Sequence, residues 1–245
     1  MILSKFLRYL RGDLTRKTLL AVLLPLILAS YFGILTLVAL LYPDRYDWRY
    51  LSISKLLYPV TNPQFHYLAA FSVAVTGVLM LPFAGYIRRR LRGASPRTAA
   101  VGATLFFAGC LCLTLSGLIA SHPAHGTARF PKLHEILARL AAIGIGLGMA
   151  VFNACATKGC FRAAPGNAHR RRGLLISWNL LTLPVILVAV SWVAIRICLK
   201  RTAPAYHTIA TSAAWHVGFW EWPGSVVLFA FLVCSVLFLP EADSW

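Results

Sequence analysis

Residues 65–92 read FHYLAAFSVAVTGVLMLPFAGYIRRRLR, an apolar run that begins beside a histidine and ends in a cluster of arginines. Its apolar part, 65–87, is long enough to cross a bilayer as a helix, which needs about 20 mostly apolar residues. It lacks period-two alternation, which argues against a barrel strand. Arginines that follow a span are typical of the cytoplasmic side. This stretch therefore predicts an α-helical membrane protein and the direction of one span.

Five further apolar windows complete a set of six predicted spans. The six windows are residues 18–42, 65–87, 98–120, 134–156, 174–197 and 214–239. Composition agrees, because 59% of the 245 residues are hydrophobic and only 13% are charged, whereas a soluble domain carries about 25% charged residues. We expect an all-α integral membrane protein in which residues 1–245 form a single six-helix membrane domain.

Lysines and arginines are distributed unequally between the two sides of these spans. Fifteen of the 24 lie in the tail 1–17 and in the loops after the second and fourth spans, and nine lie on the other side. The positive-inside rule then places both termini in the cytoplasm. The formal charge of +17 is arranged in short runs between spans, without a nucleic-acid-binding motif. We therefore expect membrane lipids as partners, with anionic headgroups at the cytoplasmic face, and no nucleic acid.

The tail 1–17 has its own pattern. Apolar residues recur at helical spacing from Leu3 to Leu14, with Lys5, Arg8 and Arg11 between them. This predicts a short basic amphipathic helix that lies on the cytoplasmic leaflet. The alternative is a frayed start of the first span.

The segment 43–64 joins the first two spans on the outer side. It is too apolar and aromatic for a free linker, so we expect it to pack as a cap on the outer end of the bundle. Ser52 and Ser54 lie in it without the G-x-S-x-G pattern of a nucleophile, and we expect them to cap a helix or a turn. In the fourth span, Gly144 and Gly148 stand in GxxxG register, for which packing within the chain is favoured over a dimer seam.

Titratable residues gather at this outer end, because spans two, four and six all enter from it. His66, His134 and His216 begin these spans. An ionisable residue within a span is costly and marks a functional-site hypothesis. The expected outer polar pocket comprises Ser52, Ser54, Asn62, His66, His134, Glu135, Arg139, His216 and Glu221.

Glu221 is the most informative of these residues, since it lies within the last span between two tryptophans. It needs a partner or a proton there. Arg139 is the expected partner because it lies at a similar depth in the fourth span. Glu135 is spaced i,i+4 from Arg139 and can join the same network. If so, Arg139→Leu destabilises the protein in detergent.

The three histidines have three interpretations. They can be structural groups that hydrogen-bond to the cap. They can be zinc ligands of an acid–base site acting on lipid headgroups, since three histidines and a carboxylate are the ligand types of catalytic zinc, although none has HExxH spacing. They can also ligate a haem b. The structural interpretation is favoured over zinc and haem, and the six cysteines lack CxxC spacing and are expected to be buried hydrophobic residues.

The order of these motifs resembles the FRAG/DRAM/SFK superfamily of six-span membrane proteins and its bacterial relatives of unknown function. The matching positions are Ser52-Ile-Ser54, then Asn62-Pro63-x-Phe65-His66, then His134, and finally Trp220-Glu221-Trp222. The resemblance implies six spans with cytoplasmic termini. Members of that family include a Golgi factor for GPI-anchor lipid remodelling, lysosomal autophagy modulators and a plasma-membrane protein that affects lipid asymmetry. By resemblance, the chain is expected to act on or sense lipids at the non-cytoplasmic leaflet.

Three functions follow as hypotheses. The first is a lipid-related membrane protein that binds, remodels or organises lipid through the outer polar pocket. The second is a non-catalytic subunit that docks on partner proteins in a larger membrane complex. The third is a metal-dependent lipid hydrolase that uses His66, His134 and His216. Whether the chain is an enzyme stays open at this point.

Overall fold

The computed structural model describes residues 2–120, 133–162, 173, 178–179, 211–213 and 216–239. These residues form helices and loops and contain no strand. Five helices among them are long and apolar enough to span a membrane: Arg16–Leu40, His66–Leu91, Pro96–Ala120, Leu133–Cys160 and Gly218–Phe238. They coincide with five of the six predicted windows. The sixth window, 174–197, lies outside the described residues except for Trp178 and Asn179.

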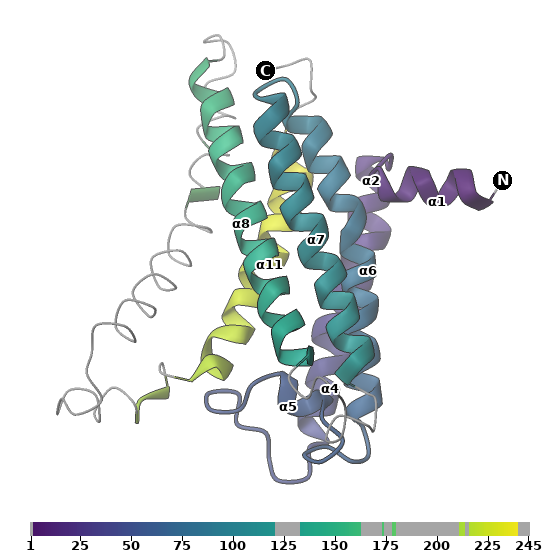
Figure 1. The fold of residues 1–245 in the computed structure, drawn as a ribbon, viewed down its shortest axis with the longest axis vertical. Coiled ribbons are helices and arrows are strands. Elements are labelled where there is room, and N and C mark those ends of the chain that lie inside the picture. Colours follow the sequence, from purple (N-terminus) through teal and green to yellow (C-terminus); the bar gives the residue numbers. More distant parts are fainter. Residues whose placement is uncertain are drawn as a thin grey trace.

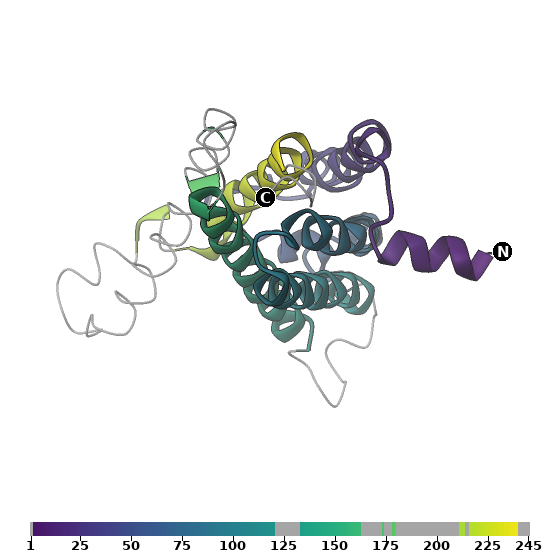
Figure 2. The same cartoon turned by 90° about the horizontal axis from the view of Figure 1, so that it is seen from above.

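The membrane helices form two layers (Figures 1 and 2). One layer is a row in which α7 (Pro96–Ala120) packs between α6 (His66–Leu91) and α8 (Leu133–Arg162). The other layer holds the first membrane helix and α11 (Val217–Phe238), which contact each other through the Phe32 and Phe229 rings at 6.0 Å. The described part of the chain is therefore a helical bundle, in agreement with the predicted class.

Glycines let α7 and α8 approach closely. A Cβ atom on Gly144 would lie 2.9 Å from the Gly109 Cα atom, and one on Gly148 would lie 2.8 Å from the Phe106 Cβ atom. Gly146, between them, faces open space. The GxxxG pair thus serves helix packing within the chain, as expected, because only glycine permits such backbone contact.

The first membrane helix is irregular. Two π-helical segments, η1 (Leu19–Leu23) and η2 (Leu28–Gly33), alternate with α2 (Arg16–Thr18), α3 (Leu24–Ile27) and α4 (Ile34–Leu40). In η2 the buried Ser30 hydroxyl lies 3.0 Å from the Thr76 hydroxyl of α6, and Ser72 donates a hydrogen bond to the Ser30 carbonyl. π-Helical turns cluster at functional sites, and this buried polar contact ties the irregular helix to α6.

One end of the bundle, here called the basic end, carries α1 (Ile2–Leu10) and the arginine-rich end of α6. Arg16 donates hydrogen bonds from Nε to the Val236 carbonyl at 2.7 Å and from Nη2 to the Leu237 carbonyl at 2.8 Å. A cation at a helix C-terminus satisfies carbonyls that lack intrahelical partners. The start of the first membrane helix and the end of α11 therefore meet at the same end of the bundle.

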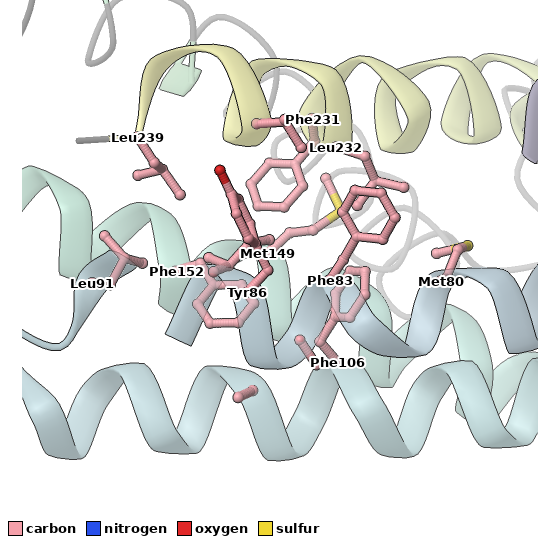
Figure 3. Packing of buried hydrophobic residues seen from close by; sticks show 14 of the residues in the cluster. Met80, Phe83, Tyr86, Leu91, Phe106, Met149, Phe152, Phe231, Leu232 and Leu239 are labelled. Atoms are coloured by element: carbon pink, nitrogen blue, oxygen red, sulfur yellow. The ribbon is translucent and has the colours of Figure 1, made fainter. Parts of the chain in front are cut away.

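The interior is packed in two clusters of buried apolar side chains. The larger lies toward the basic end, where rings of α6, α7, α8 and α11 converge, as Figure 3 shows for Phe83, Phe106, Phe152 and Phe231. The smaller joins α4, α5 (Ser54–Leu57) and the start of α6 under the 43–64 segment. Along α8, by contrast, exposed apolar side chains recur at helical spacing: Ile136, Leu140, Ile143 and Leu147. Such a stripe suits contact with lipid.

Candidate functional site

The 43–64 segment packs across the end of the bundle opposite the basic end, here called the cap end. Asn62 organises it: the side chain is fully buried, its Nδ2 donates to the Leu56 carbonyl at 2.8 Å and its Oδ1 accepts from the Phe65 amide at 3.3 Å. Its own amide donates to the Tyr58 carbonyl at 2.8 Å. A buried amide side chain with both ends bonded fixes a loop. The predicted cap is therefore a folded element, and Asn62 is part of its framework.

Glu221 joins α11 to this cap. Its Oε2 accepts a hydrogen bond from the Ile53 backbone amide. One helical turn further, the Ser225 hydroxyl lies 2.9 Å from the Tyr31 hydroxyl of the first membrane helix. The Ser225 hydroxyl also donates to the Glu221 carbonyl at 2.7 Å. A carboxylate that accepts from a backbone amide makes a strong, charge-assisted bond. Glu221 thus connects the last span to the cap rather than facing open space.

Backbone contact reinforces this junction. A Cβ atom on Gly218 would collide with the Leu51 carbonyl group and approach the Ser52 amide at 2.9 Å. Next to it, the Trp222 indole N–H donates to the Tyr46 hydroxyl at 3.3 Å, and Tyr46 donates to the Leu51 carbonyl at 2.9 Å. The first turns of α11 therefore lie directly on the 46–53 part of the cap.

The electrostatics of the cap favour neutral tyrosines. Burial raises the pKa of Tyr46, the Trp222 hydrogen bond lowers it in part, and the negative charge of Glu221 raises it again. Burial also raises the pKa of Tyr58, with a smaller contribution from Glu135. On the exposed rim, hydrogen bonds from Arg49 lower the pKa of Asp47. Tyr46 and Tyr58 therefore stay protonated at neutral pH, and the Tyr46 hydroxyl serves as both hydrogen-bond donor and acceptor.

The three histidines occupy separate places around the cap. His66 Nδ1 lies 3.1 Å from the Asn62 carbonyl oxygen and 3.2 Å from that of Pro63. His134 is buried, with Nδ1 2.8 Å from the Ser116 carbonyl oxygen. Its ring meets the Tyr58 ring edge-on at 5.5 Å. The His216 ring meets the Tyr50 ring in the same way at 5.2 Å. His66 thus hydrogen-bonds to the cap, as the structural interpretation expects, whereas His134 hydrogen-bonds to Ser116 of α7 and, like His216, meets the cap through a ring contact.

No group of three or more His, Cys, Asp or Glu residues in the described parts of the chain is arranged to hold a metal ion. His66, His134 and His216 all belong to those parts. The zinc-site hypothesis therefore finds no ligand cluster among them.

The expected Glu221–Arg139–Glu135 network is wrong in its central contact. Arg139 pairs with Glu135 at 3.5 Å, but its side chain is 76% exposed and points away from the bundle interior. Glu221 meets the Ile53 amide instead. The direction in which each side chain leaves its helix decides the pairing, and Arg139 leaves α8 on the face directed away from the other helices.

The serines differ from expectation in detail. Ser52 and Ser54 bind each other through their hydroxyls at 2.7 Å, and α5 begins without a side-chain cap. The helix α6 continues through Pro82. The polar residues predicted to line an outer pocket are thus bound within the cap and its supports, apart from the exposed Glu135–Arg139 pair. Tyr31, Tyr46 and Ser225, which the sequence analysis did not single out, belong to the same junction.

Comparisons with protein-family models, with curated proteins and with solved structures give no match for this chain.

Proposed function

We propose that the chain is a six-span integral membrane protein with cytoplasmic termini that binds, remodels or organises lipid at the non-cytoplasmic leaflet through its cap end. The observation that carries the proposal is the Glu221–Ile53 hydrogen bond. A carboxylate held within a span is costly and is retained for function by default. Here it couples the last membrane helix to a cap that lies where lipid headgroups meet the protein.

The direction of the described helices supports six spans. The end of α8 lies at the basic end, where Cys155 Sγ is 3.6 Å from the Ser95 carbonyl oxygen next to the start of α7. The start of α11 lies at the cap end, against Leu51. The chain between them has to return from one end to the other, and the apolar window 174–197 has the length for that crossing.

The basic end supports cytoplasmic termini, since α1, Arg16 and the arginines of α6 gather there. Labelling with a membrane-impermeant thiol reagent on intact cells tests this orientation. A cysteine at Val60, which is 91% exposed on the cap, should react from outside. A cysteine at Ser4, exposed on α1, should react only after the membrane is opened. The reverse pattern would overturn the topology.

Lipid retention tests the function. The full chain is extracted from its membrane, washed in detergent and analysed by mass spectrometry for bound lipid. We expect wild type to retain a defined lipid class in stoichiometric amount, and Glu221→Leu to lose it. Glu221→Gln keeps an oxygen that can accept a hydrogen bond from the Ile53 amide but removes the negative charge. Lipid retention by Glu221→Gln would show that the hydrogen bond to the cap is what matters, and loss of lipid would show that the charge is needed.

Glu135→Leu is the matched control, because it removes a carboxylate from the same end, and among the described residues that carboxylate forms an ion pair only with the exposed Arg139. Equal lipid retention by Glu221→Leu, Glu135→Leu and wild type would refute the proposal. Stoichiometric co-purification of another membrane protein, without a retained lipid, would replace it by the subunit hypothesis.

A further inference from the structure

The helix α1 is held at a fixed angle to the bundle. Figures 1 and 2 show it projecting sideways from α6 rather than continuing along the bundle. The turn that ends α1 has Gly12 at φ +66°, a backbone conformation that favours glycine. A Cβ atom on Gly12 would collide with the backbone of α6 at Pro82 and Tyr86. The chain thus leaves α1 by a turn that rests directly on α6.

Polar contacts fix the same junction. Asp13 forms an ion pair with Arg89, and Arg89 also donates to the Gly12 carbonyl. The Tyr9 hydroxyl donates to the Val78 carbonyl at 2.9 Å. The α6 residues in these contacts are spaced three or four positions apart, so they lie on one face of the helix: Val78, Pro82, Tyr86 and Arg89. The orientation of α1 is therefore preorganised by the fold.

The two faces of α1 differ in character. Phe6 is 53% exposed and Leu7 41% exposed, although both are large and apolar. Ser4 and Arg8 are exposed as well and fall about 160° around the helix from Phe6 at 3.6 residues per turn, Leu7 lies between the two sides, and the exposed Arg11 belongs to the turn after α1. A helix with one exposed apolar side and one basic side lies in the plane of a membrane interface.

The structure also separates the basic residues into two groups. Arg89 is bound to Asp13 and the Gly12 carbonyl, and Arg16 is bound to the last carbonyls of α11. Arg8 and Arg11 form no ion pair with any residue that the structure describes. Two cations therefore face outward on a rigid arm, while the neighbouring arginines hold the arm and the bundle in place.

We propose that α1 is a binding element for anionic phospholipid, with Arg8 and Arg11 at the headgroup phosphates and Phe6 and Leu7 among the upper acyl chains. Charge complementarity commits the surface to an anionic bilayer, since the helix offers cations beside an apolar side. A nucleic acid would use the cations but leave Phe6 and Leu7 in water. This proposal concerns the basic end and is independent of the cap end.

The test uses the full chain in nanodiscs that contain equal amounts of phosphatidylglycerol and phosphatidylcholine. Native mass spectrometry of the released protein gives the ratio of the two lipids that stay bound. We expect wild type to favour phosphatidylglycerol. The Arg8→Gln/Arg11→Gln variant should lose this preference by roughly fivefold for each cation removed, since a basic residue near the surface contributes about that factor. Arg8→Lys/Arg11→Lys should retain most of it.

The control is Arg92→Gln/Arg97→Gln, which removes two exposed cations from the same basic end but outside α1 and should change the ratio less. An equal loss in this control would show a general charge effect and overturn the assignment to α1. An unchanged ratio in Arg8→Gln/Arg11→Gln, with the thermal midpoint of wild type, would also overturn it. The loss caused by Arg8→Gln/Arg11→Gln should be the same in the Glu221→Leu background as in wild type, so the two proposals fail separately.

Discussion

The Tyr9 hydroxyl donates a hydrogen bond to the Val78 carbonyl, the carbonyl that Pro82 leaves without its usual helical partner. In an α-helix the N–H of residue 82 would bind the carbonyl of residue 78, and proline has no N–H. Within a bilayer such a carbonyl cannot be left to water. The tail helix α1 thus supplies a hydrogen bond that the proline removes from α6, and this explains how α6 continues through Pro82.

Tyr9→Phe should therefore destabilise the protein by about 1–3 kcal/mol, the cost of an unsatisfied buried polar group. Thermal denaturation in detergent measures the change. In a Pro82→Ala background the residue 82 amide can bind the Val78 carbonyl, so the same Tyr9→Phe change should cost about 1 kcal/mol less. Strict additivity of the two substitutions would show that Tyr9 acts through something other than this carbonyl.

Arg16 offers a second prediction, because it binds the C-terminal carbonyls of α11 from the first membrane helix. Arg16→Met should lower the unfolding free energy by about 1–2 kcal/mol, as charge-assisted bonds at a helix C-terminus are lost. Lys17→Met removes the same charge from an exposed neighbour and should change it by less than about 0.5 kcal/mol. Chemical denaturation of both variants in matched detergent makes the comparison, and equal effects would contradict the role of Arg16.

Gly218 tests the contact between α11 and the cap. Gly218→Ala places a methyl group against the Leu51 backbone and should cost about 1–3 kcal/mol, as overpacking does. Gly224 on the same helix faces open space, so Gly224→Ala should stabilise the helix by about 0.5–1 kcal/mol. Hydrogen exchange of the 46–57 amides provides the local measurement. Faster exchange is expected in Gly218→Ala alone, and its absence would mean that the cap does not depend on this contact.

The sequence locates the five described membrane helices well, because a bilayer imposes length and polarity on each span. The window 98–120 differs from α7 by two residues at its start, and 65–87 finds the start of α6 within one residue. The end of α6 is missed by four residues, since helix geometry continues into the arginines after the apolar run stops. Hydropathy reports where the membrane ends, and not where the hydrogen bonds of a helix end.

The candidate site is less predictable, because a side chain's direction around its helix depends on packing. The sequence predicts a similar depth for Glu221 and Arg139, yet the Glu221 side chain meets the cap and the Arg139 side chain is exposed on α8. The Tyr9–Val78 bond had a signal in the sequence, namely a proline inside a span, which frees the carbonyl four residues earlier. Nothing in the sequence says which residue supplies the missing donor. That answer needs the turn at Gly12, which brings α1 against α6.

Arg139→Leu now has an expected outcome opposite to that from the sequence. The Arg139 side chain is 76% exposed and pairs only with Glu135 among the described residues. Exposed i,i+4 pairs contribute about 0.3–0.5 kcal/mol. The thermal midpoint of Arg139→Leu should therefore stay close to that of wild type, and Glu135→Gln should behave alike. A large destabilisation by Arg139→Leu would restore a role for Arg139 inside the bundle.

The cap should lose stability at high pH through Tyr46. Burial raises the pKa of this phenol above its ordinary value of 10.0, with the Glu221 charge adding to the effect. Above pH about 10, the unfolded chain releases this proton while the folded chain keeps it. The folded state then binds more protons, so the free energy of unfolding falls as pH rises through this window. Tyr46→Phe removes this titrating group, so the free energy of unfolding should fall less steeply with pH in the variant.

The measurement is the slope of the unfolding free energy against pH in both proteins, taken from about pH 9 to about pH 11 because an unperturbed tyrosine titrates near pH 10. Equal slopes would mean that Tyr46 titrates as an ordinary phenol and that the Trp222–Tyr46–Leu51 contacts do not persist in solution.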